Sequence, residues 1–391
     1  MLVGIVGAPN KGKSTLFSAM TMVEAEIADY PFTTIKPNFG MTYATKECVE
    51  KELGVKCNPR NSLCINGTRM LPVNVVDVAG LVEGAHLGKG MGNQFLNDLA
   101  NADALIIVVD ASGNTDQNGN NAPGSDPLND VRIITDEISE WFASIIKRNM
   151  SSIMRKSDGL SALSNALAGI GATKEQIEMA ALESYLSLSD IAWNDEDIKS
   201  FASALLKMNK PMVIAANKSD LRSSEENIKR LKEHYGEKVF ACSAAIELAL
   251  RKAAKQNIVD YIPGSRSFNI INEKISEDQK NALLYIGDFL KKESTGIQEL
   301  INHTVFEVLG NIVVYPVEDE NKYSDHFGNV LPDAILIKKG YTAQQLAYKI
   351  HTELGENMLY AVDAKKKIRL SKNYILKDND VIKIVSATKK K

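Results

Sequence analysis

The chain has 391 residues, of which 44% are hydrophobic and 24% are charged, and this composition is typical of a globular protein rather than of a collagen-like, disordered or disulfide-stapled chain. Its 46 Lys and Arg residues nearly balance 49 Asp and Glu residues, and the net charge of −3 gives no sign of a general nucleic-acid-binding surface. Because the sequence has neither an apolar run of 18 residues nor the basic start and small-residue cleavage site of a signal peptide, we expect a cytoplasmic protein.

The first part of the chain predicts an α/β fold. Short apolar runs rich in branched residues, which are typical of buried strands, occur at 2–6, 73–77, 105–110 and 212–216. Helical periodicity separates some of these runs, as at 95–102. Strands that alternate with helices predict a mainly parallel sheet with helices on both faces.

A long helical segment interrupts this alternation after Asp110. Residues 114–127 contain Asn, Gly and Pro but almost no apolar side chains, which indicates a loop. The following stretch is helix-like, and no strand signal returns before Pro211. We therefore predict a helical insertion over 117–208, followed by a further helical region over 246–310.

The character of the chain changes again at Ile312. Short strand-like runs follow, with one amphipathic helix over 342–355 between them. Thr342 is suited to cap the start of this helix, and Gly355 is suited to end it. Strands and a helix in this order predict a separate α+β domain over 311–391.

Three of the four cysteines, Cys48, Cys57 and Cys64, lie nine and seven residues apart. They form no C-x-x-C pair, and no neighbouring histidine offers a fourth ligand for zinc. The pattern therefore favours reduced thiols over a metal site.

The strongest motif is GAPNKGKS, from Gly7 to Ser14, which matches G-x-x-x-x-G-K-[S/T] between an apolar strand and a helix-like run. Its glycines allow backbone N–H groups to point at a β-phosphate, Lys13 reaches the β- and γ-phosphates, and Ser14 is a ligand for Mg²⁺. A chance glycine-rich turn is the alternative, and the flanking elements disfavour it. The residues expected at the phosphates are Gly7, Ala8, Pro9, Asn10, Lys11, Gly12, Lys13, Ser14 and Thr15.

A second motif, DVAG, follows the run at 73–77. Asp77 is expected to hold Mg²⁺ through a water molecule, and the Gly80 N–H to contact the γ-phosphate. A D-x-x-G motif is weak by itself, but its place about 65 residues after a phosphate loop strengthens it.

Two further motifs predict a guanine site. In NKSD the Asp220 carboxylate can accept hydrogen bonds from guanine N1–H and N2–H₂, a donor pair that adenine lacks. Asn217 is expected to tie this loop to the phosphate loop, and Lys218 to pack its aliphatic stem over the base. In SAA the residues Ser243, Ala244 and Ala245 are small enough to let a backbone N–H approach guanine O6.

In this order the motifs are similar to those of the P-loop GTPases. Residues 30–38 (YPFTTIKPN) resemble switch I of the Obg-like GTPases, and residues 77–113 resemble their switch II. The chain most resembles the archaeal form of the YchF subfamily, which has a helical insertion, a segment similar to IVVYPVED at 312–319 and a C-terminal TGS domain of β-grasp type. The resemblance implies a G domain over 1–310 and a TGS domain over 311–391.

The resemblance also implies roles for residues of the switch regions. Thr34 would close on Mg²⁺ and the γ-phosphate, while Leu81 stands where Ras has the glutamine that orients the attacking water. An aliphatic side chain cannot position water, so either His86 assists hydrolysis or the intrinsic rate is low, and His86 is otherwise a plain loop histidine. Asn10 would be a ligand for K⁺, or simply a turn-forming residue after Pro9.

The function implied is that of a slow GTPase switch that associates with ribosomes, RNA or translation factors. We expect a monomer that uses Mg²⁺, and K⁺ as a second cofactor, without a membrane partner. Bacterial and eukaryotic YchF-like proteins have a base-reading motif that ends in Glu and accept ATP, whereas this chain keeps NKSD and should prefer GTP. The alternatives are an ATPase of the same fold and a nucleotide-gated binding module in which hydrolysis is incidental.

Overall fold

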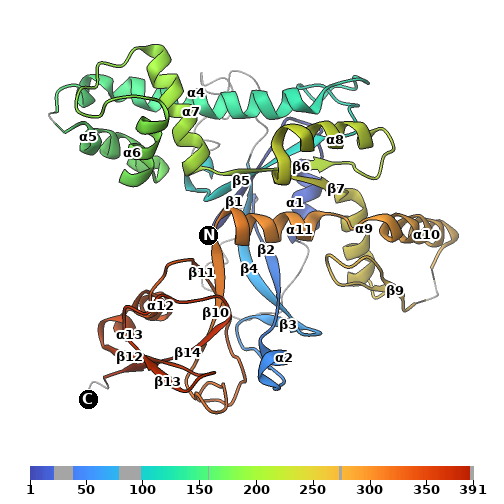
Figure 1. The fold of residues 1–391 in the computed structure, drawn as a ribbon. Helices are drawn as coiled ribbons and strands as arrows, with labels where there is room; N and C mark the ends of the chain where they lie inside the picture. Colours follow the sequence, from blue (N-terminus) through green and yellow to red (C-terminus); the bar gives the residue numbers. More distant parts are fainter. Residues whose placement is uncertain (22–37, 79–97, 157, 273–274, 388–391) are drawn as a thin grey trace. The chain divides into compact units, whose positions relative to one another are not determined.

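The computed structural model describes residues 1–21, 38–78, 98–156, 158–272 and 275–387 (Figure 1). Four residues of the expected site, Thr34, Gly80, Leu81 and His86, lie outside these ranges. The chain divides into two compact units. The first holds the N-terminal segment and Asn74–Leu300, and the second holds Tyr43–Val73 and Ile301–Lys391. The sequence pattern does not reveal that Tyr43–Val73 groups with the C-terminal part.

One seven-stranded sheet has the order β2-β4-β1-β5-β6-β7, with β3 paired to β4, and its strands β1, β5, β6 and β7 belong to the first unit. The pairings β4–β1, β1–β5, β5–β6 and β6–β7 are parallel, which confirms the predicted parallel sheet. β5 is buried at every residue and reads ALIIVVD, because a central parallel strand is covered on both faces. The strands are β1 (Leu2–Val6), β2 (Phe39–Glu47), β3 (Leu63–Ile65), β4 (Thr68–Asp77), β5 (Ala104–Asp110), β6 (Met212–Asn217) and β7 (Val239–Cys242).

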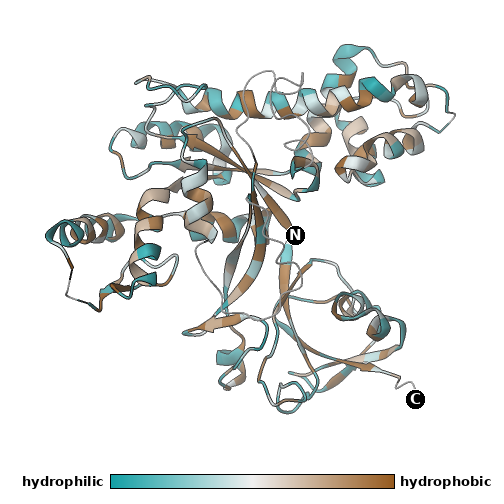
Figure 2. Ribbon diagram, turned by 180° about the vertical axis from the view of Figure 1, so that it is seen from behind, coloured by the Kyte–Doolittle hydropathy of each residue, from teal (hydrophilic) through white to brown (hydrophobic). Residues whose placement is uncertain are grey.

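In the described residues, four α-helices and a 3₁₀ turn at Ala168–Ile170 lie between β5 and β6, and the last helix ends one residue beyond the predicted insertion. The longest begins after Asp126, whose side chain accepts a hydrogen bond from the Leu128 N–H, and has proline in its first turn. Its apolar residues recur every three or four positions, and Figure 2 shows this alternation along the helix. The buried face continues the core of the sheet through Phe142 and Ile146. These helices are α4 (Pro127–Ile153), α5 (Gly159–Leu167), α6 (Lys174–Glu183) and α7 (Asp195–Asn209).

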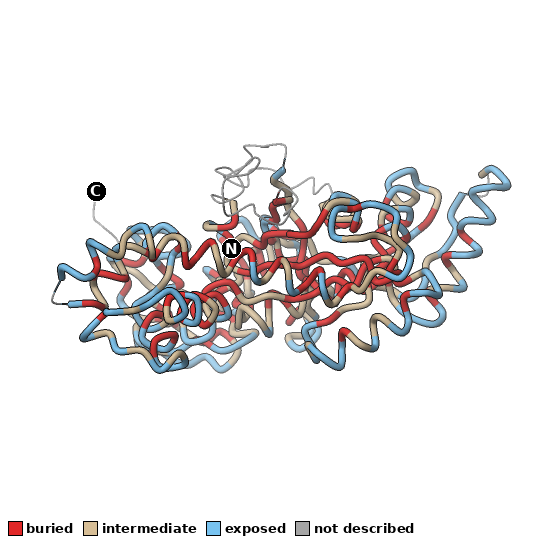
Figure 3. Tube along the Cα trace, turned by 90° about the horizontal axis from the view of Figure 1, so that it is seen from above, coloured by how far each residue is buried: buried red, intermediate tan, exposed pale blue. Residues whose placement is uncertain are grey.

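The remaining helices of the first unit accompany the sheet, and a small hairpin lies beyond them. Figure 3 shows that buried residues concentrate in the central strands, while exposed residues dominate the outer helices. In the described part of the chain, no helix is both long and apolar enough to cross a membrane. The elements are α1 (Lys13–Thr21), α8 (Ser224–Tyr235), α9 (Ala244–Lys255), β8 (Val259–Asp260), β9 (Asn269–Ile270), α10 (Glu277–Lys292) and α11 (Ile297–His303), which continues as a π-helical turn at Thr304–Val308.

The second unit contains a five-stranded mixed sheet in the order β11-β10-β14-β12-β13. β10 pairs in parallel with β14, and the other pairings are antiparallel. Leu346 and Ala347 pack a helix onto this sheet. The elements are α2 (Glu50–Leu53), β10 (Asn311–Val317), β11 (Ile335–Lys338), α12 (Ala343–Ile350), α13 (Thr352–Glu356), β12 (Met358–Asp363), β13 (Ile368–Leu370) and β14 (Asp380–Ser386).

The single helix expected over 342–355 is in fact two helices. Thr342 caps the first one as expected, in a reciprocal capping box with Gln345. His351 then adopts an extended backbone that ends α12, and its Nδ1 accepts the Glu353 N–H at 3.2 Å to cap α13. Gly355 therefore lies inside α13 and does not end a helix. Its lack of a side chain matters because a Cβ there would lie 2.3 Å from the Tyr348 ring.

Candidate functional site

The phosphate loop occupies the turn between β1 and α1, as its sequence predicts. Gly12 has a φ of +88°, and a Cβ at this position would lie 2.2 Å from Asn217 Nδ2. A Cβ on Gly7 would lie 2.8 Å from the Val108 carbonyl oxygen. Both glycines are therefore required by the close approach of neighbouring atoms, and Gly12 is required by its positive φ as well. Ala8 and Pro9 complete the loop, and Thr15 lies in the first turn of α1.

Sheet pairing brings Asp77 beside the end of the phosphate loop. Ile5 of β1 is in register with Asp77 at the end of β4. The Asp77 carboxylate accepts hydrogen bonds from Lys13 Nζ at 2.5 Å and from Ser14 Oγ at 3.2 Å. A carboxylate and a hydroxyl are hard oxygen ligands of the kind Mg²⁺ prefers, and an adjacent ammonium group suits phosphate oxygens. The residues present therefore fit a Mg²⁺–phosphate site.

The base-reading motifs meet the phosphate loop through Asn217. Its Nδ2 donates to the Lys11 carbonyl at 3.0 Å, and its Oδ1 accepts the Ala244 N–H at 3.1 Å. The Ser243 hydroxyl donates to the Asp220 carboxylate at 2.6 Å. One buried side chain thus joins the phosphate loop to the NKSD and SAA motifs, which lie more than 200 residues further along the chain. Ala245 lies in the first turn of α9 and is exposed.

Lys218 makes an ion pair that the motif by itself does not predict. It has a φ of +64°, and its Nζ lies 2.8 Å from the Asp110 carboxylate at the end of β5. Burial by itself would raise the pKa of Asp110, but hydrogen bonds from Lys218, Ser112 and Thr115 outweigh this effect and lower the pKa below its usual value. Asp110 therefore stays ionised and fixes the Lys218 side chain. The sequence feature that could have indicated this ion pair is Asp110, an acidic residue at the end of an otherwise apolar strand.

A second unpredicted ion pair anchors the phosphate loop to the insertion. Lys11 is fully buried, and its Nζ lies 2.7 Å from the Asp130 carboxylate of α4 and 2.7 Å from the Thr115 carbonyl. Asn10 adds a hydrogen bond from its Nδ2 to the Gly119 carbonyl at 2.9 Å. Burial raises the pKa of Asp130 above its usual value, although the hydrogen bond from Lys11 opposes this. Asn10 and Lys11, which occupy x positions of the phosphate motif, thus hold the start of α4 and the loop that precedes it.

These side chains gather at the carboxyl ends of parallel strands, where open α/β sheets bind their ligands. A glycine-rich strand-to-helix loop, a Ser–Asp pair beside its lysine, and an Asn-Lys-x-Asp loop tied to it define a P-loop nucleoside triphosphatase of the GTPase class.

Known proteins support this class over the whole chain. Residues 2–156 match the family model "50S ribosome-binding GTPase", residues 215–319 match "Obg-like GTPase YGR210-like, G4 motif-containing domain", and residues 327–386 match "TGS domain". A GTP-binding protein of Methanocaldococcus jannaschii is 53% identical, with 99% of this chain and 100% of that protein covered. The crystal structure of a GTP-binding protein from Pyrococcus horikoshii has a TM-score of 0.78 at 39% identity, covering 99% of this chain and 100% of that one. The ribosome-binding ATPase YchF of Mycoplasma genitalium is 28% identical over 97% of each chain.

The chain belongs to the Obg-like, YchF-type family of GTPases, with a P-loop GTPase domain and a C-terminal TGS domain. It is thus a GTP-binding protein of the nucleoside triphosphatase class. This membership confirms the resemblance and the fold class expected from the sequence.

The buried Lys11–Asp130 pair is open to a direct test. In Asp130→Ala the Lys11 ammonium group would stay buried without its counter-charge, and we expect the free energy of unfolding to fall by about 3–5 kcal/mol. The double variant Lys11→Met with Asp130→Leu should recover most of this loss, because it leaves no buried charge. Denaturant midpoints measure both effects.

Asp136→Ala is the matched control, because Asp136 is an exposed residue of the same helix. An Asp130→Ala variant as stable as the Asp136→Ala control would contradict the structural role of the pair.

Proposed function

We propose that this protein is a slow GTPase switch that selects GTP over ATP and associates with ribosomes or translation factors in the cytoplasm. The observation that carries the proposal is the position of Asn217, which joins the Lys11 carbonyl of the phosphate loop to the Ala244 N–H. This bond ties the NKSD loop, which contains Asp220, to the phosphate loop. Base recognition and phosphate binding then act on one nucleotide.

Asp220 and its partner Ser243 support guanine recognition. One carboxylate oxygen accepts the Ser243 hydroxyl at 2.6 Å, which orients the group and leaves acceptor capacity for the base edge. Guanine offers two adjacent donors to such a carboxylate, while adenine leaves it without a matching donor pair. A buried polar group without its partner costs about 1–3 kcal/mol, which is enough for a clear preference.

Ser14 and Asp77 would hold Mg²⁺, with Thr34 joining from switch I and Gly80 contacting the γ-phosphate. Mg²⁺ held there would neutralise charge on the phosphate oxygens. Lys13 lies beside both residues and would bind the β- and γ-phosphates in the same place. The roles of Thr34 and Gly80 rest on the sequence motifs.

Catalysis is proposed to be slow because Leu81 cannot orient a water molecule. His86 would assist hydrolysis, and Asn10 would bind K⁺ through its side-chain oxygen. The Asn10 Nδ2 atom donates to the Gly119 carbonyl, and this hydrogen bond fixes the orientation of the amide and of its acceptor atom Oδ1.

Ribosome association is proposed from the relatives. The family model over 2–156 describes a 50S ribosome-binding GTPase, and the Mycoplasma relative is a ribosome-binding ATPase. We expect this chain to act as a monomer, with its nucleotide state controlling the association.

Exchange of Asp220 tests base selection. Wild type with Mg²⁺ should bind GTP at least tenfold more tightly than ATP, a difference of about 1.4 kcal/mol. Asp220→Asn should lose this preference and should favour xanthosine triphosphate, since the new amide can donate to the xanthine C2 carbonyl. Asp288→Asn, on the exposed face of α10, is the control. Equal or tighter ATP binding by wild type would favour the ATPase alternative.

If K⁺ takes part in catalysis, the rate of GTP hydrolysis should depend on which monovalent cation is present. Replacing K⁺ with Na⁺ at constant ionic strength should lower kcat for GTP by about tenfold or more, because a charge that stabilises the transition state is lost. Asn10→Gly keeps the positive φ of this position and should show the low rate in both salts. Asn118→Ala, in the neighbouring exposed loop, should retain the K⁺ effect. Equal rates of GTP hydrolysis by wild type in K⁺ and in Na⁺ would contradict the K⁺ hypothesis.

Ribosome binding should depend on the nucleotide. We expect co-sedimentation with ribosomes in the presence of a non-hydrolysable GTP analogue, weaker co-sedimentation with GDP, and faster GTP turnover when ribosomes are added. Lys13→Ala should abolish the nucleotide effect, because it removes the phosphate-binding ammonium group. Fast turnover without ribosomes would argue against a partner-controlled switch. If a His86 variant kept ribosome binding while Lys13→Ala lost it, hydrolysis would be incidental.

A further inference from the structure

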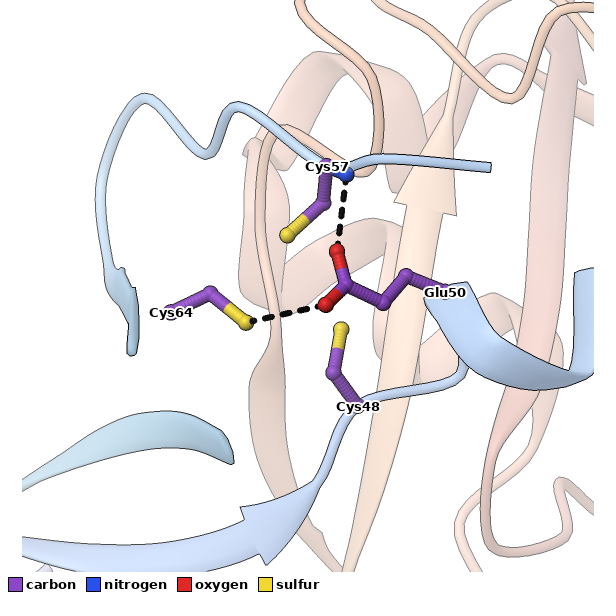
Figure 4. Close-up of side chains that lie close together, drawn as sticks. All are labelled: Cys48, Glu50, Cys57 and Cys64. Atoms are coloured by element: carbon purple, nitrogen blue, oxygen red, sulfur yellow. Dashed lines mark hydrogen bonds between the residues drawn. The ribbon is translucent and has the colours of Figure 1, made fainter. Parts of the chain in front are cut away.

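The second unit brings three cysteines and one glutamate into a single cluster. Cys48 follows β2, Glu50 begins α2, Cys57 lies in the loop after α2, and Cys64 is in β3. Their sulfur and carboxylate ligand atoms all lie within 4.8 Å of one another (Figure 4). The spacing of the cysteines gave no fourth ligand, and the structure supplies one in Glu50. The three cysteines are free thiols in the structure, and the sequence pattern by itself favoured reduced thiols over a metal site.

We propose that Cys48, Glu50, Cys57 and Cys64 bind a single Zn²⁺ ion. This inference does not depend on the proposed GTPase function. Four ligands form a closed tetrahedral set, which is typical of structural rather than catalytic zinc. Thiolates favour Zn²⁺ over Mg²⁺ or Ca²⁺, which take oxygen ligands.

The dimensions of the cluster suit one ion. Zinc–sulfur bonds of about 2.3 Å place the ligand atoms of a tetrahedron about 3.8 Å apart. Cys64 Sγ and Glu50 Oε1 already lie 3.9 Å apart, and no separation in the cluster exceeds the ideal one by more than about 1 Å. Small side-chain rotations would close this gap. Cys57, Cys64 and Glu50 are partly exposed, so an ion has a path of entry.

Glu50 is oriented for binding through one oxygen. Its Oε2 accepts the Cys57 backbone N–H at 2.8 Å, and its Oε1 faces the Cys64 sulfur. A hydrogen bond to the second oxygen of a ligating carboxylate holds the first oxygen in position and is a regular feature of metal sites.

A buried arginine beside the cluster supplies independent support. Arg69 is fully buried and donates to Ser62 Oγ at 2.8 Å, to the Leu331 carbonyl at 3.0 Å and to Cys48 Sγ at 3.6 Å. Its Nε has no hydrogen-bond partner, and the nearest negative charges among the described residues, those of Glu50 and Asp333, act on its guanidinium without a direct ion pair. A buried cation needs negative charge nearby. Zn²⁺ bound by three thiolates and one carboxylate has a formal charge of −2 and would supply it.

The ion would stabilise a loop that contacts the C-terminal part of the same unit. The Asn58 N–H donates to the Val330 carbonyl at 3.1 Å, and the Arg60 N–H donates to the Pro332 carbonyl at 2.9 Å. These residues lie between the ligands Cys57 and Cys64. Zinc would thus fix a loop that holds the segment at the start of the TGS match.

The test uses the full chain, stripped of metal by a chelator under reducing conditions. We expect it to take up one equivalent of Zn²⁺ with a Kd of about 1 nM or tighter, measured against a competing chelator, as for structural zinc sites. Co²⁺ in its place should give thiolate-to-metal charge-transfer absorption and intense tetrahedral bands. Zn²⁺ should protect Cys48, Cys57 and Cys64 from a thiol reagent, and chelation should restore their reactivity.

Matched variants assign the ligands. Cys57→Ser and Cys64→Ser should weaken Zn²⁺ binding by at least about 100-fold, beyond the loss typical of outer-shell partners. Cys242→Ser is the control, because Cys242 is a buried thiol at the end of β7, outside the cluster. Glu50→Cys should keep one equivalent and raise the Co²⁺ charge-transfer intensity.

Three results would overturn the proposal: wild type that takes up no Zn²⁺, a Co²⁺ complex without thiolate bands, or two thiols missing from the unreduced, denatured chain, which would indicate a disulfide. Each of these results is measured on wild type, so the proposal can be tested even if a variant fails to fold.

Discussion

The nucleotide site depends on one buried hydrogen-bonding side chain, that of Asn217. Parallel strands end at the same edge of the sheet, so β1, β5, β6 and β7 bring their following loops together there. Adjacency by itself leaves the loops free to shift against one another. The Asn217 amide removes this freedom, because its nitrogen binds the phosphate loop and its oxygen binds the first residue of α9. Gly12 must lack a Cβ for this contact to form.

Two ion pairs, one buried and one partly buried, extend this arrangement to the rest of the first unit. Asp110 holds Lys218 under the base-reading loop, and Asp130 holds Lys11 under the phosphate loop. Such pairs add little net stability, but they are costly to break and so favour one geometry. Asp130 belongs to α4, which means that the phosphate loop and the helical insertion share a contact. A shift in the position of the phosphate loop can therefore be transmitted to the helical insertion through this contact, and the reverse also holds.

In the second unit, residues 43–73 are held in place by other contacts. Residues 43–73 include the three-residue strand β3 and the four-residue helix α2, and neither of these two elements contains a buried residue. Their loop is joined to residues 330–332 by backbone hydrogen bonds, and Arg69 binds the Leu331 carbonyl from a fully buried position. A metal ion on the Cys48–Cys64 ligands would hold this region in the way that small domains with little core use zinc.

The sequence by itself determined the class of the protein, because the phosphate loop, NKSD and the parallel strands are local patterns whose chemistry and periodicity are carried by neighbouring residues. Thr342 as a helix cap is of the same kind. Only the tertiary structure decided which distant groups meet: Asp110 with Lys218, Asp130 with Lys11, and Glu50 with three cysteines. These contacts depend on strand register and loop paths, which no short window of sequence specifies. The break at His351 likewise depends on a backbone conformation that the helical periodicity conceals.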